Sequence, residues 1–498
     1  MVKPATKSFL LTCALLMLYS ISRLPVLTSE LTPFLFCDEE IFLNDVHSLI
    51  TNNRYVYAVY TAGGMNIIPL FILGKLLYYF NIYSESNLLF LGRFFYLFLL
   101  GIFTCLYLYK LTKVISKNSI IGFISVIVFI VSPYCISQSK IWYPDDYIYL
   151  FSTIFLFYVV KYMQTRKTKY LFIITASLVL ACSVKYTAFL LFSLLPIIFL
   201  KEDNLIEATK KYFYMGFFFI LGFLFCNYAL MIHPLGWIDA FQWNIQNYQP
   251  HQWSKISGPI YYFFLTYVTF LTPIHFISYC VGYRDLFKKN RELFSIFLIF
   301  PIFYIYFMGT ANFVLNRNVS ILIPFVIPIL SIGIYQISLF LINNKKTFIL
   351  LFFYLPPLLC FIFITYSDFG IDSRHIAYEW LKKNVKANES FITNESCSVP
   401  TFGDKFFTGP TSELIEDFVV INSYWSGGEN FPERGRGLLQ TINQKNLHFY
   451  NFNDASLYKP IVHRDYNVGD IFFEKYILVK KINKNGPSIY IFKKNIAQ

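Results

Sequence analysis

Long stretches of uncharged, apolar residues recur through the first 366 positions of the chain, and they constrain its fold more than any other feature. Runs of 17 to 24 such residues are separated by short polar loops, and about 20 apolar residues suffice for a helix to span a bilayer. Of the 498 residues, 56% are hydrophobic and only 14% are charged, whereas a soluble domain carries roughly 25% charged residues. The sequence therefore predicts a polytopic α-helical membrane protein.

The net charge of +13 is concentrated in the first part of the chain. From Asp368 onward, 16 Lys and Arg residues stand against 15 Asp and Glu residues, so almost all of the excess precedes that position. Most of it lies near the N-terminus and in five short loops between apolar runs, at 110–117, 161–169, 201–211, 284–291 and 345–346. Cytoplasmic loops of membrane proteins carry such a surplus. The charge therefore predicts a cytoplasmic N-terminus and gives no indication of a nucleic-acid partner.

The alternation of apolar runs and basic loops predicts the membrane topology. We expect crossings near 8–27, 119–137, 147–163, 169–183, 186–200, 212–233, 259–281, 293–309, 319–341 and 347–366. Two further apolar segments occur at 66–83 and 88–109, and the parity of the topology allows only one of them to cross. Because the connector NIYSES carries no positive charge, we expect 66–83 to lie along the outer leaflet or dip into it. The prediction is eleven crossings, with the C-terminus outside.

The C-terminal part of the chain has a different composition. The stretch DSRHIAYEWLKKNVKANES has an amphipathic helical period, and FVVINSY, IFFEKYILVKK and SIYIFKK have the pattern of strands between turn residues. We therefore predict a transmembrane module over 1–366, with an external loop at 28–65, and a small extracytoplasmic α/β domain over 367–498.

Charged residues outside the basic loops collect at the predicted outer face of the membrane. Carboxylates occur in the first external loop and in the loop before 147–163, and cations occur near the outer ends of predicted helices. Ionisable groups at membrane depth are costly and commonly face a polar cavity. The outer face thus combines groups suited to a phosphorylated lipid and a hydroxyl acceptor. The residues concerned are Asp38, Glu39, Asp145, Asp146, Arg93, Lys185 and Arg317.

Several of these residues also have a purely structural interpretation. Asp38 to Glu40 could be the solvated start of a juxtamembrane helix, where acids favour the helix dipole. Asp146 could cap the next helix, and Lys185 could extend its ammonium group to the interface. His251 could be an ordinary loop histidine. No tight spacing of His and carboxylates indicates a metal site.

Five sequence motifs occur in a fixed order along residues 1–385. They are CDEE at 37–40, LGRFF at 91–95, VSPY at 131–134 with YPDDY at 143–147, SVKYT at 183–187, and NRNVSILIP at 316–324 followed by DSRHIAYEW at 372–380. This order resembles the dolichyl-phosphate-mannose protein mannosyltransferase superfamily, which includes the bacterial aminoarabinose transferase. The chain departs from the family pattern at Ile41 and Phe42, where a Tyr is usual, and at Pro69, which replaces a His-Pro-Pro motif.

The resemblance implies a C-type glycosyltransferase fold and an inverting transfer of a sugar from a polyprenyl-phosphate donor to a hydroxyl acceptor, in a protein, lipid A or a glycan. The general base would be Asp38, with Glu39 as neighbour or alternate. Arg93, Lys185 and Arg317 would stabilise the phosphate leaving group. Asp145 or Asp146 would orient sugar or acceptor, and His251 is a further substrate-binding candidate. The displacement requires no cofactor, although a divalent metal remains compatible with it.

Three other functions are compatible with a chain of this build, and one of them is a non-catalytic protein that only binds a carrier lipid. A polysaccharide polymerase or ligase would also use a lipid-linked donor, but such proteins carry their polar insert between late helices. A transporter or flippase would show paired repeats and a midplane site, and no repeat is visible here. The bias towards Ile, Phe, Asn and Lys favours a bacterial inner membrane.

Overall fold

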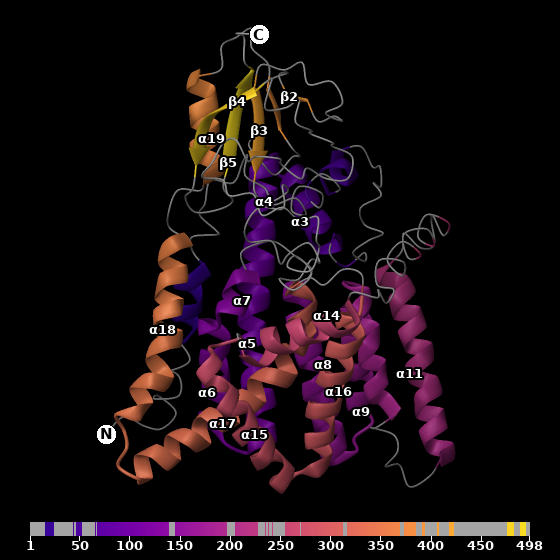
Figure 1. Ribbon diagram of the computed structural model, residues 1–498. Helices are drawn as coiled ribbons and strands as arrows, with labels where there is room; N and C mark the ends of the chain where they lie inside the picture. Colours follow the sequence, from indigo (N-terminus) through magenta and orange to yellow (C-terminus); the bar gives the residue numbers. More distant parts are fainter. Residues whose placement is uncertain are drawn as a thin grey trace. The chain divides into compact units, whose positions relative to one another are not determined.

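Two compact units make up the chain, one comprising residues 1–27 and 41–365 and the other residues 28–40 and 366–498. The computed structural model describes residues 15–23, 46–51, 67–138, 145–196, 205–227, 254–311 except 269, 316–368 and 373–384, with five strands between 391 and 494 and isolated positions at 43, 65, 235, 238 and 242. Figure 1 traces both units along the sequence.

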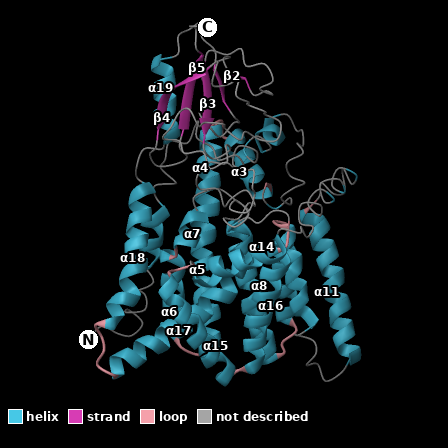
Figure 2. Cartoon of the chain, in the orientation of Figure 1, coloured by secondary structure: helices cyan, strands magenta, loops and turns pink. Residues whose placement is uncertain are grey.

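The described part of the first unit is helical (Figure 2). A helix over 15–23 is followed by α3 (Ile68–Tyr79), α4 (Glu85–Arg93), the π-helical segment η3 (Phe94–Leu99), α5 (Leu100–Ser116), α6 (Ser119–Val131), α7 (Pro133–Gln138), α8 (Asp145–Thr165), α9 (Lys169–Cys182), the 3₁₀ helix η4 (Tyr186–Leu194), α11 (Leu205–Cys226), α14 (Ser254–Phe263), η5 (Phe264–Val268), η6 (Pro273–His275), α15 (Phe276–Lys289), α16 (Arg291–Gly309), η7 (Asn316–Leu322), α17 (Ile323–Asn343) and α18 (Ile349–Asp368).

Four helices in the described part of the chain are long and apolar enough to cross a membrane. They are Asn87–Ser116, Asp145–Thr165, Arg291–Gly309 and Asn318–Asn343, and a bent pair, Gly258–Val268 with Pro273–Lys289, would make a fifth. The helices predicted from 88–109, 147–163, 293–309 and 319–341 are therefore present, and the total of eleven crossings stays a prediction. Helix α3 has 12 residues, fewer than the roughly 20 that span a bilayer.

Two predicted crossings differ from single straight α-helices. The segment 259–281 contains two helices that meet at 89°. Pro273 begins the second helix after Thr272, whose backbone is fully extended, and a proline at this position starts a helix rather than continuing one. The segment 186–200 begins as the 3₁₀ helix η4 over nine residues. Hydropathy does not distinguish these geometries, because they contain equally apolar residues.

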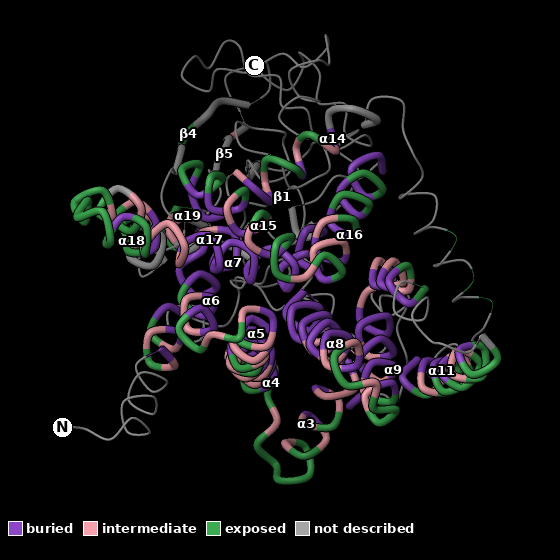
Figure 3. Tube along the Cα trace, turned by 90° about the horizontal axis from the view of Figure 1, so that it is seen from below, coloured by how far each residue is buried: buried purple, intermediate pink, exposed green. Residues whose placement is uncertain are grey.

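Helix α8 is central to the first unit. It packs against α5, α9, α17 and η7, and both its first-turn acids and its apolar side chains are buried. In Figure 3, α8 and α17 are mostly purple, whereas α11 and α18 carry long green stretches. Exposed Phe213, Phe217 and Phe225 make the outer face of α11 apolar, as expected for a helix that contacts lipid.

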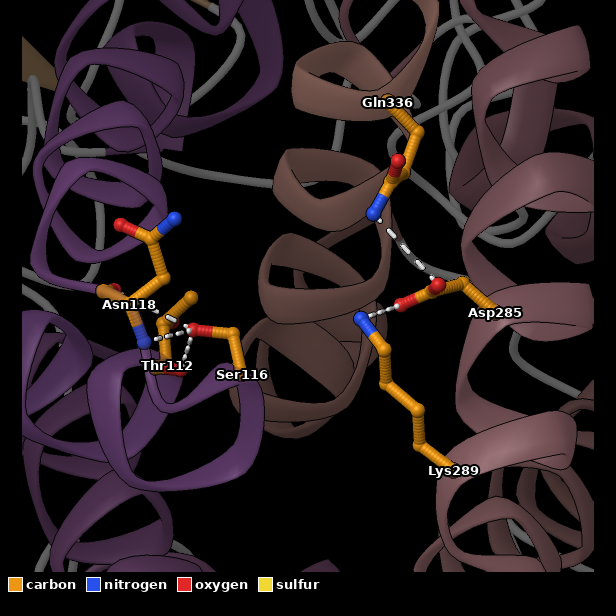
Figure 4. Close-up of polar contacts among 6 residues, drawn as sticks. All are labelled: Thr112, Ser116, Asn118, Asp285, Lys289 and Gln336. Atoms are coloured by element: carbon orange, nitrogen blue, oxygen red, sulfur yellow. Dashed lines mark hydrogen bonds and ion pairs between the residues drawn. The ribbon is translucent and has the colours of Figure 1, made fainter.

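Helices α15 and α17 approach each other closely at two glycines. A Cβ atom at Gly282 would overlap the carbonyl oxygen of Ile329, and one at Gly333 would overlap that of Ser278. Near the far end of the same pair, Asp285 of α15 accepts hydrogen bonds from Lys289 and, at 3.4 Å, from Gln336 of α17 (Figure 4). Small residues in the middle and a polar contact at the end therefore fix this helix pair.

The second unit contains α19 (Ser373–Asn384) and a five-stranded sheet. Its strands are β1 (Phe391–Thr393), β2 (Phe406–Phe407), β3 (Phe418–Asn422), β4 (Tyr476–Ile482) and β5 (Ile489–Lys494), in the order β2-β1-β3-β5-β4. Strand β1 pairs in parallel with β2 and β3, while β5 is antiparallel to β3 and β4. Helix α19 packs against β4 and β5, so this unit has a mixed α/β architecture.

Candidate functional site

The first turn of α8 carries two buried carboxylates. Asp145 is 2% exposed and Asp146 is 3% exposed. The helix already begins at Asp145, so Asp146 lies in the first turn and not at the N-cap position considered from the sequence. The positive end of the helix dipole favours negative charge there, which offsets part of the cost of burial.

Lys185 forms an ion pair with the first of these carboxylates. Its Nζ atom lies 2.8 Å from Oδ1 of Asp145, and the two side chains are 16% and 3% exposed. Lys185 belongs to the turn between α9 and η4, in extended backbone conformation. Two residues that the sequence nominated separately are thus in direct contact. A lysine that only extended its ammonium group to the membrane interface would have water around that group. The ammonium group of Lys185 instead contacts a buried carboxylate.

Hydrogen bonds to three segments of the chain hold the turn that carries Lys185. Its backbone N–H donates to the carbonyl of Ala181 at 3.0 Å. The carbonyl of Ser183 accepts from the N–H of Met65 at 3.2 Å, and the Ser183 hydroxyl accepts from Nδ2 of Asn227 at 2.9 Å. The residues before α3 and after α11 therefore both fix the position of the lysine.

Arg93 lies in another helix, directly before a segment that contacts α8. It is the last residue of α4, it is 3% exposed, and the π-helical segment η3 follows directly. Tyr96 in η3 packs edge-on against Tyr147 of α8, with ring centroids 4.9 Å apart. Segment η3 therefore contacts α8 one residue beyond Asp146, and Arg93 directly precedes this segment in the chain. A π-helical segment in a long helix is often found at a functional site.

The segment η7, which carries Arg317, packs against α8. Three hydrogen bonds anchor it. The Tyr304 hydroxyl donates to the Asn318 carbonyl at 2.6 Å, Nδ2 of Asn318 donates to Tyr262 at 3.2 Å, and the hydroxyls of Tyr134 and Ser320 lie 3.3 Å apart. The backbone of Arg317 is thereby held beside α8 by α7, α14 and α16.

Three of the predicted site residues lie outside the described residues, namely Asp38, Glu39 and His251. Their predicted roles stay predictions. Within the part of the chain that the structure describes, no group of three or more His, Cys, Asp or Glu side chains could hold a metal ion.

Sequence reasoning did not nominate Arg23 for the site, although its side chain is only 1% exposed. A signal for it was present. Arg23 ends an apolar run of the first helix, as Lys185 and Arg93 interrupt or begin other apolar runs, so the same argument from costly intramembrane charge would have included it.

Residues 89–228 match the sequence model of a family described as dolichyl-phosphate-mannose-protein mannosyltransferase. This segment contains Arg93, Asp145, Asp146 and Lys185. This match covers 140 of the 498 residues, and over them the chain is similar to that family. The resemblance drawn from the five sequence motifs is therefore confirmed. No curated protein matches the chain.

Two solved structures, of ArnT and of an archaeal oligosaccharyltransferase, share the fold of this chain. ArnT from Cupriavidus metallidurans in the apo state aligns with a TM-score of 0.53 at 10% identity, over 84% of this chain and 93% of that protein. The archaeal oligosaccharyltransferase AglB from Archaeoglobus fulgidus, in complex with an inhibitory peptide and a dolichol-phosphate, aligns with a TM-score of 0.50 at 10% identity, over 83% and 69%.

ArnT from Cupriavidus metallidurans bound to undecaprenyl phosphate aligns with a TM-score of 0.49 at 11% identity, over 67% of this chain and 61% of that one. In this comparison the chain thus spans less than two thirds of the matched protein. At such identities, the matches that reach a TM-score of 0.5 show the fold alone. The fold is the polytopic C-type glycosyltransferase fold that the sequence predicted.

Proposed function

We propose that this protein transfers a sugar from a polyprenyl-phosphate-linked donor to a hydroxyl acceptor, with inversion at the anomeric carbon. The observation that carries the proposal is the buried ion pair between Lys185 and Asp145, which lies inside the segment that matches the family. The complex of AglB with a dolichol-phosphate supports a lipid-phosphate carrier for a chain of this fold.

Lys185 is the proposed ligand of the carrier phosphate. An ammonium group has three N–H donors, so Lys185 can keep its contact with Asp145 while it donates to a phosphate oxygen. As the sugar leaves, negative charge grows on the phosphate, and a fixed cation stabilises that charge more in the transition state than in the ground state. Asp145 keeps the ammonium in place. Arg93 and Arg317 supply further positive charge from α4 and η7.

The acceptor hydroxyl loses a proton as it attacks the anomeric carbon. Asp38 is the proposed general base, with Glu39 as its neighbour or alternate, since a positioned carboxylate accelerates such a step by roughly 10² to 10⁴. Asp146 is proposed to hold the acid-rich end of α8 in place, and His251 to contact the substrate. The reaction would take place at the outer face of a bacterial inner membrane, with a protein, a lipid or a glycan as acceptor.

Purified protein in proteoliposomes tests this function directly. It is incubated with radiolabelled polyprenyl-phosphate sugars and with membrane extract from cells that lack the gene, as the source of acceptor. Transfer of a single labelled sugar with release of polyprenyl phosphate is the expected result. Label that accumulates inside the vesicles without transfer would indicate a transporter, and transfer of a preassembled oligosaccharide would indicate a ligase. Either outcome contradicts the proposal.

A further inference from the structure

Arg23 is among the most deeply buried side chains in the described residues. It is the last described residue of the helix over 15–23 and is 1% exposed. Its Nη1 atom donates to the Ser22 hydroxyl at 2.9 Å. Nε and Nη2 have no hydrogen-bond partner among the described residues. Burial of an uncompensated charge is expensive, so the protein must place a negative charge near this guanidinium.

The surroundings of Arg23 hold it in a defined position. Its guanidinium carbon lies 5.0 Å from the centroid of the Tyr19 ring, and that ring stacks on Phe129 of α6 with centroids 6.4 Å apart. Space for Tyr19 exists because position 101 is a glycine, where a Cβ atom would overlap the tyrosine hydroxyl. Helices α5 and α6 thus fix Tyr19, and Tyr19 supports the guanidinium through a cation–π contact.

A candidate for this negative charge is Asp146, a buried carboxylate in the first turn of α8. Arg23 interacts electrostatically with Asp146, and each of the two also acts on Tyr19 and on Cys135 of α7. The titratable groups that face this carboxylate from the surrounding elements include Tyr19, Cys135, Tyr149 and the neighbouring Asp145. Oδ2 of Asp146 has no hydrogen-bond partner in the part of the chain that the structure describes.

The charges at the start of α8 therefore fall into two sets. Asp145 is in direct contact with Lys185, whereas Asp146 and Arg23 are both buried and each has side-chain polar atoms with no hydrogen-bond partner among the described residues. We infer that Arg23 is the charge partner of Asp146 and a positioning residue, which holds that carboxylate behind the Asp145–Lys185 pair. Arg23 does not touch substrate in this arrangement. It acts by keeping the first turn of α8 in place.

A double-mutant cycle tests this pairing without use of the proposed transferase activity. The variants are Arg23→Met, Asp146→Asn and the two together, with Arg23→Lys as the conservative change. Melting temperature is measured on the full-length protein in detergent. Loss of one member of a buried pair leaves an uncompensated charge, whereas loss of both does not. We expect Arg23→Met to lower the melting temperature by several degrees, and the double variant to regain most of this loss. Arg23→Lys should keep most of the wild-type value.

Arg291 provides the matched control. It lies over the Phe287 ring at 5.3 Å, the same type of contact, but it is exposed on α16. Arg291→Met and Asp146→Asn should have additive effects. If Arg23→Met and Asp146→Asn are equally additive, the pairing is refuted. Should Arg23→Met yield no folded protein, recovery of folded protein in the double variant supports the pairing, and equal loss in both variants refutes it.

A second readout separates positioning from general stability. With any donor that the wild type turns over, Arg23→Met should reduce kcat at least tenfold and leave KM for the donor within about threefold, and Arg23→Lys should restore kcat. A variant that lowers melting temperature while kcat stays at the wild-type value would show a structural role only and overturn the positioning role.

Discussion

Lys185 and Asp145 are separated by 40 positions in the sequence, yet Nζ and Oδ1 lie 2.8 Å apart and both side chains are largely buried. A second Lys–Asp pair in the same unit has the same 2.8 Å separation, between Lys289 and Asp285. That pair lies within one helix and its lysine is 54% exposed. Exposed ion pairs of this kind contribute little to stability. The two pairs therefore have the same separation but differ in how strongly each charge depends on its partner.

The comparison between these pairs leads to the first prediction. Lys185→Met should reduce sugar transfer by roughly 10² or more, because loss of one positioned donor to a developing anion has that effect. Asp145→Asn should reduce it about tenfold, since the ammonium loses its fixed partner. Lys289→Met and Asp285→Asn should stay within twofold of the wild type. Initial rates with a radiolabelled donor measure this, and equal rates for all four variants would contradict the role of Lys185.

The acids of the first external loop supply the second prediction. Asp38→Asn keeps the shape of the side chain and removes the base, so the rate of transfer should fall by roughly 10² to 10⁴. Glu39→Gln should have a smaller effect. Single-turnover kinetics at saturating donor isolates the chemical step. Wild-type rates for both variants would exclude this loop as the source of the base.

Gly333 gives a prediction about stability. A Cβ atom there would overlap the Ser278 carbonyl of α15, so Gly333→Ala should destabilise the protein by about 1–3 kcal/mol through overpacking. Gly216 of α11 has no neighbour within 4 Å of its would-be Cβ. Gly216→Ala should therefore be neutral or stabilising by up to about 1 kcal/mol. Thermal unfolding in detergent compares them, and a Gly333→Ala variant as stable as Gly216→Ala would disprove the close approach.

Tyr304 tests the importance of η7. Tyr304→Phe removes the hydroxyl that donates to the Asn318 carbonyl at 2.6 Å, a loss of about 1 kcal/mol. We expect a several-fold rise in KM for the lipid-linked donor, because Arg317 lies on the loosened segment. The control is Tyr354→Phe, whose hydroxyl lies 2.6 Å from the Ser338 hydroxyl on exposed residues. If the two variants have the same KM, η7 does not position a donor-binding group.

The helices that the sequence predicted well have charged residues at one or both ends. Segments 147–163, 169–183 and 293–309 correspond to α8, α9 and α16 within three residues, because charged residues mark both ends of the first two apolar runs and the start of the third. The bend between α14 and α15 has no such marker, since the run around it is apolar throughout and only Pro273 indicates a break. Hydropathy reports which residues avoid water and is insensitive to the path of the backbone.

The candidate site was predicted in part, for a related reason. Charge in an apolar context identified Lys185, Asp145, Asp146 and Arg93, all of which lie in the first unit with their side chains buried or half-buried. Their partners could not be predicted, because the contact of Lys185 with Asp145 depends on how α8 is rotated and on the turn after α9. The orientation of a helix about its axis is set by tertiary packing, as at Tyr96 and Tyr147.

The π-helical segment after Arg93 inserts an additional residue into an otherwise regular helix. Each residue of an α-helix adds a turn of about 100° about the helix axis. The additional residue in Phe94–Leu99 therefore rotates the side chains of α4 about this axis relative to those of α5. Removal of one phenylalanine from this stretch would leave the hydropathy profile almost unchanged and would swing the guanidinium by about 100° relative to α5. In evolution, this part of the chain should tolerate exchange of one aromatic residue for another far more readily than a change in length.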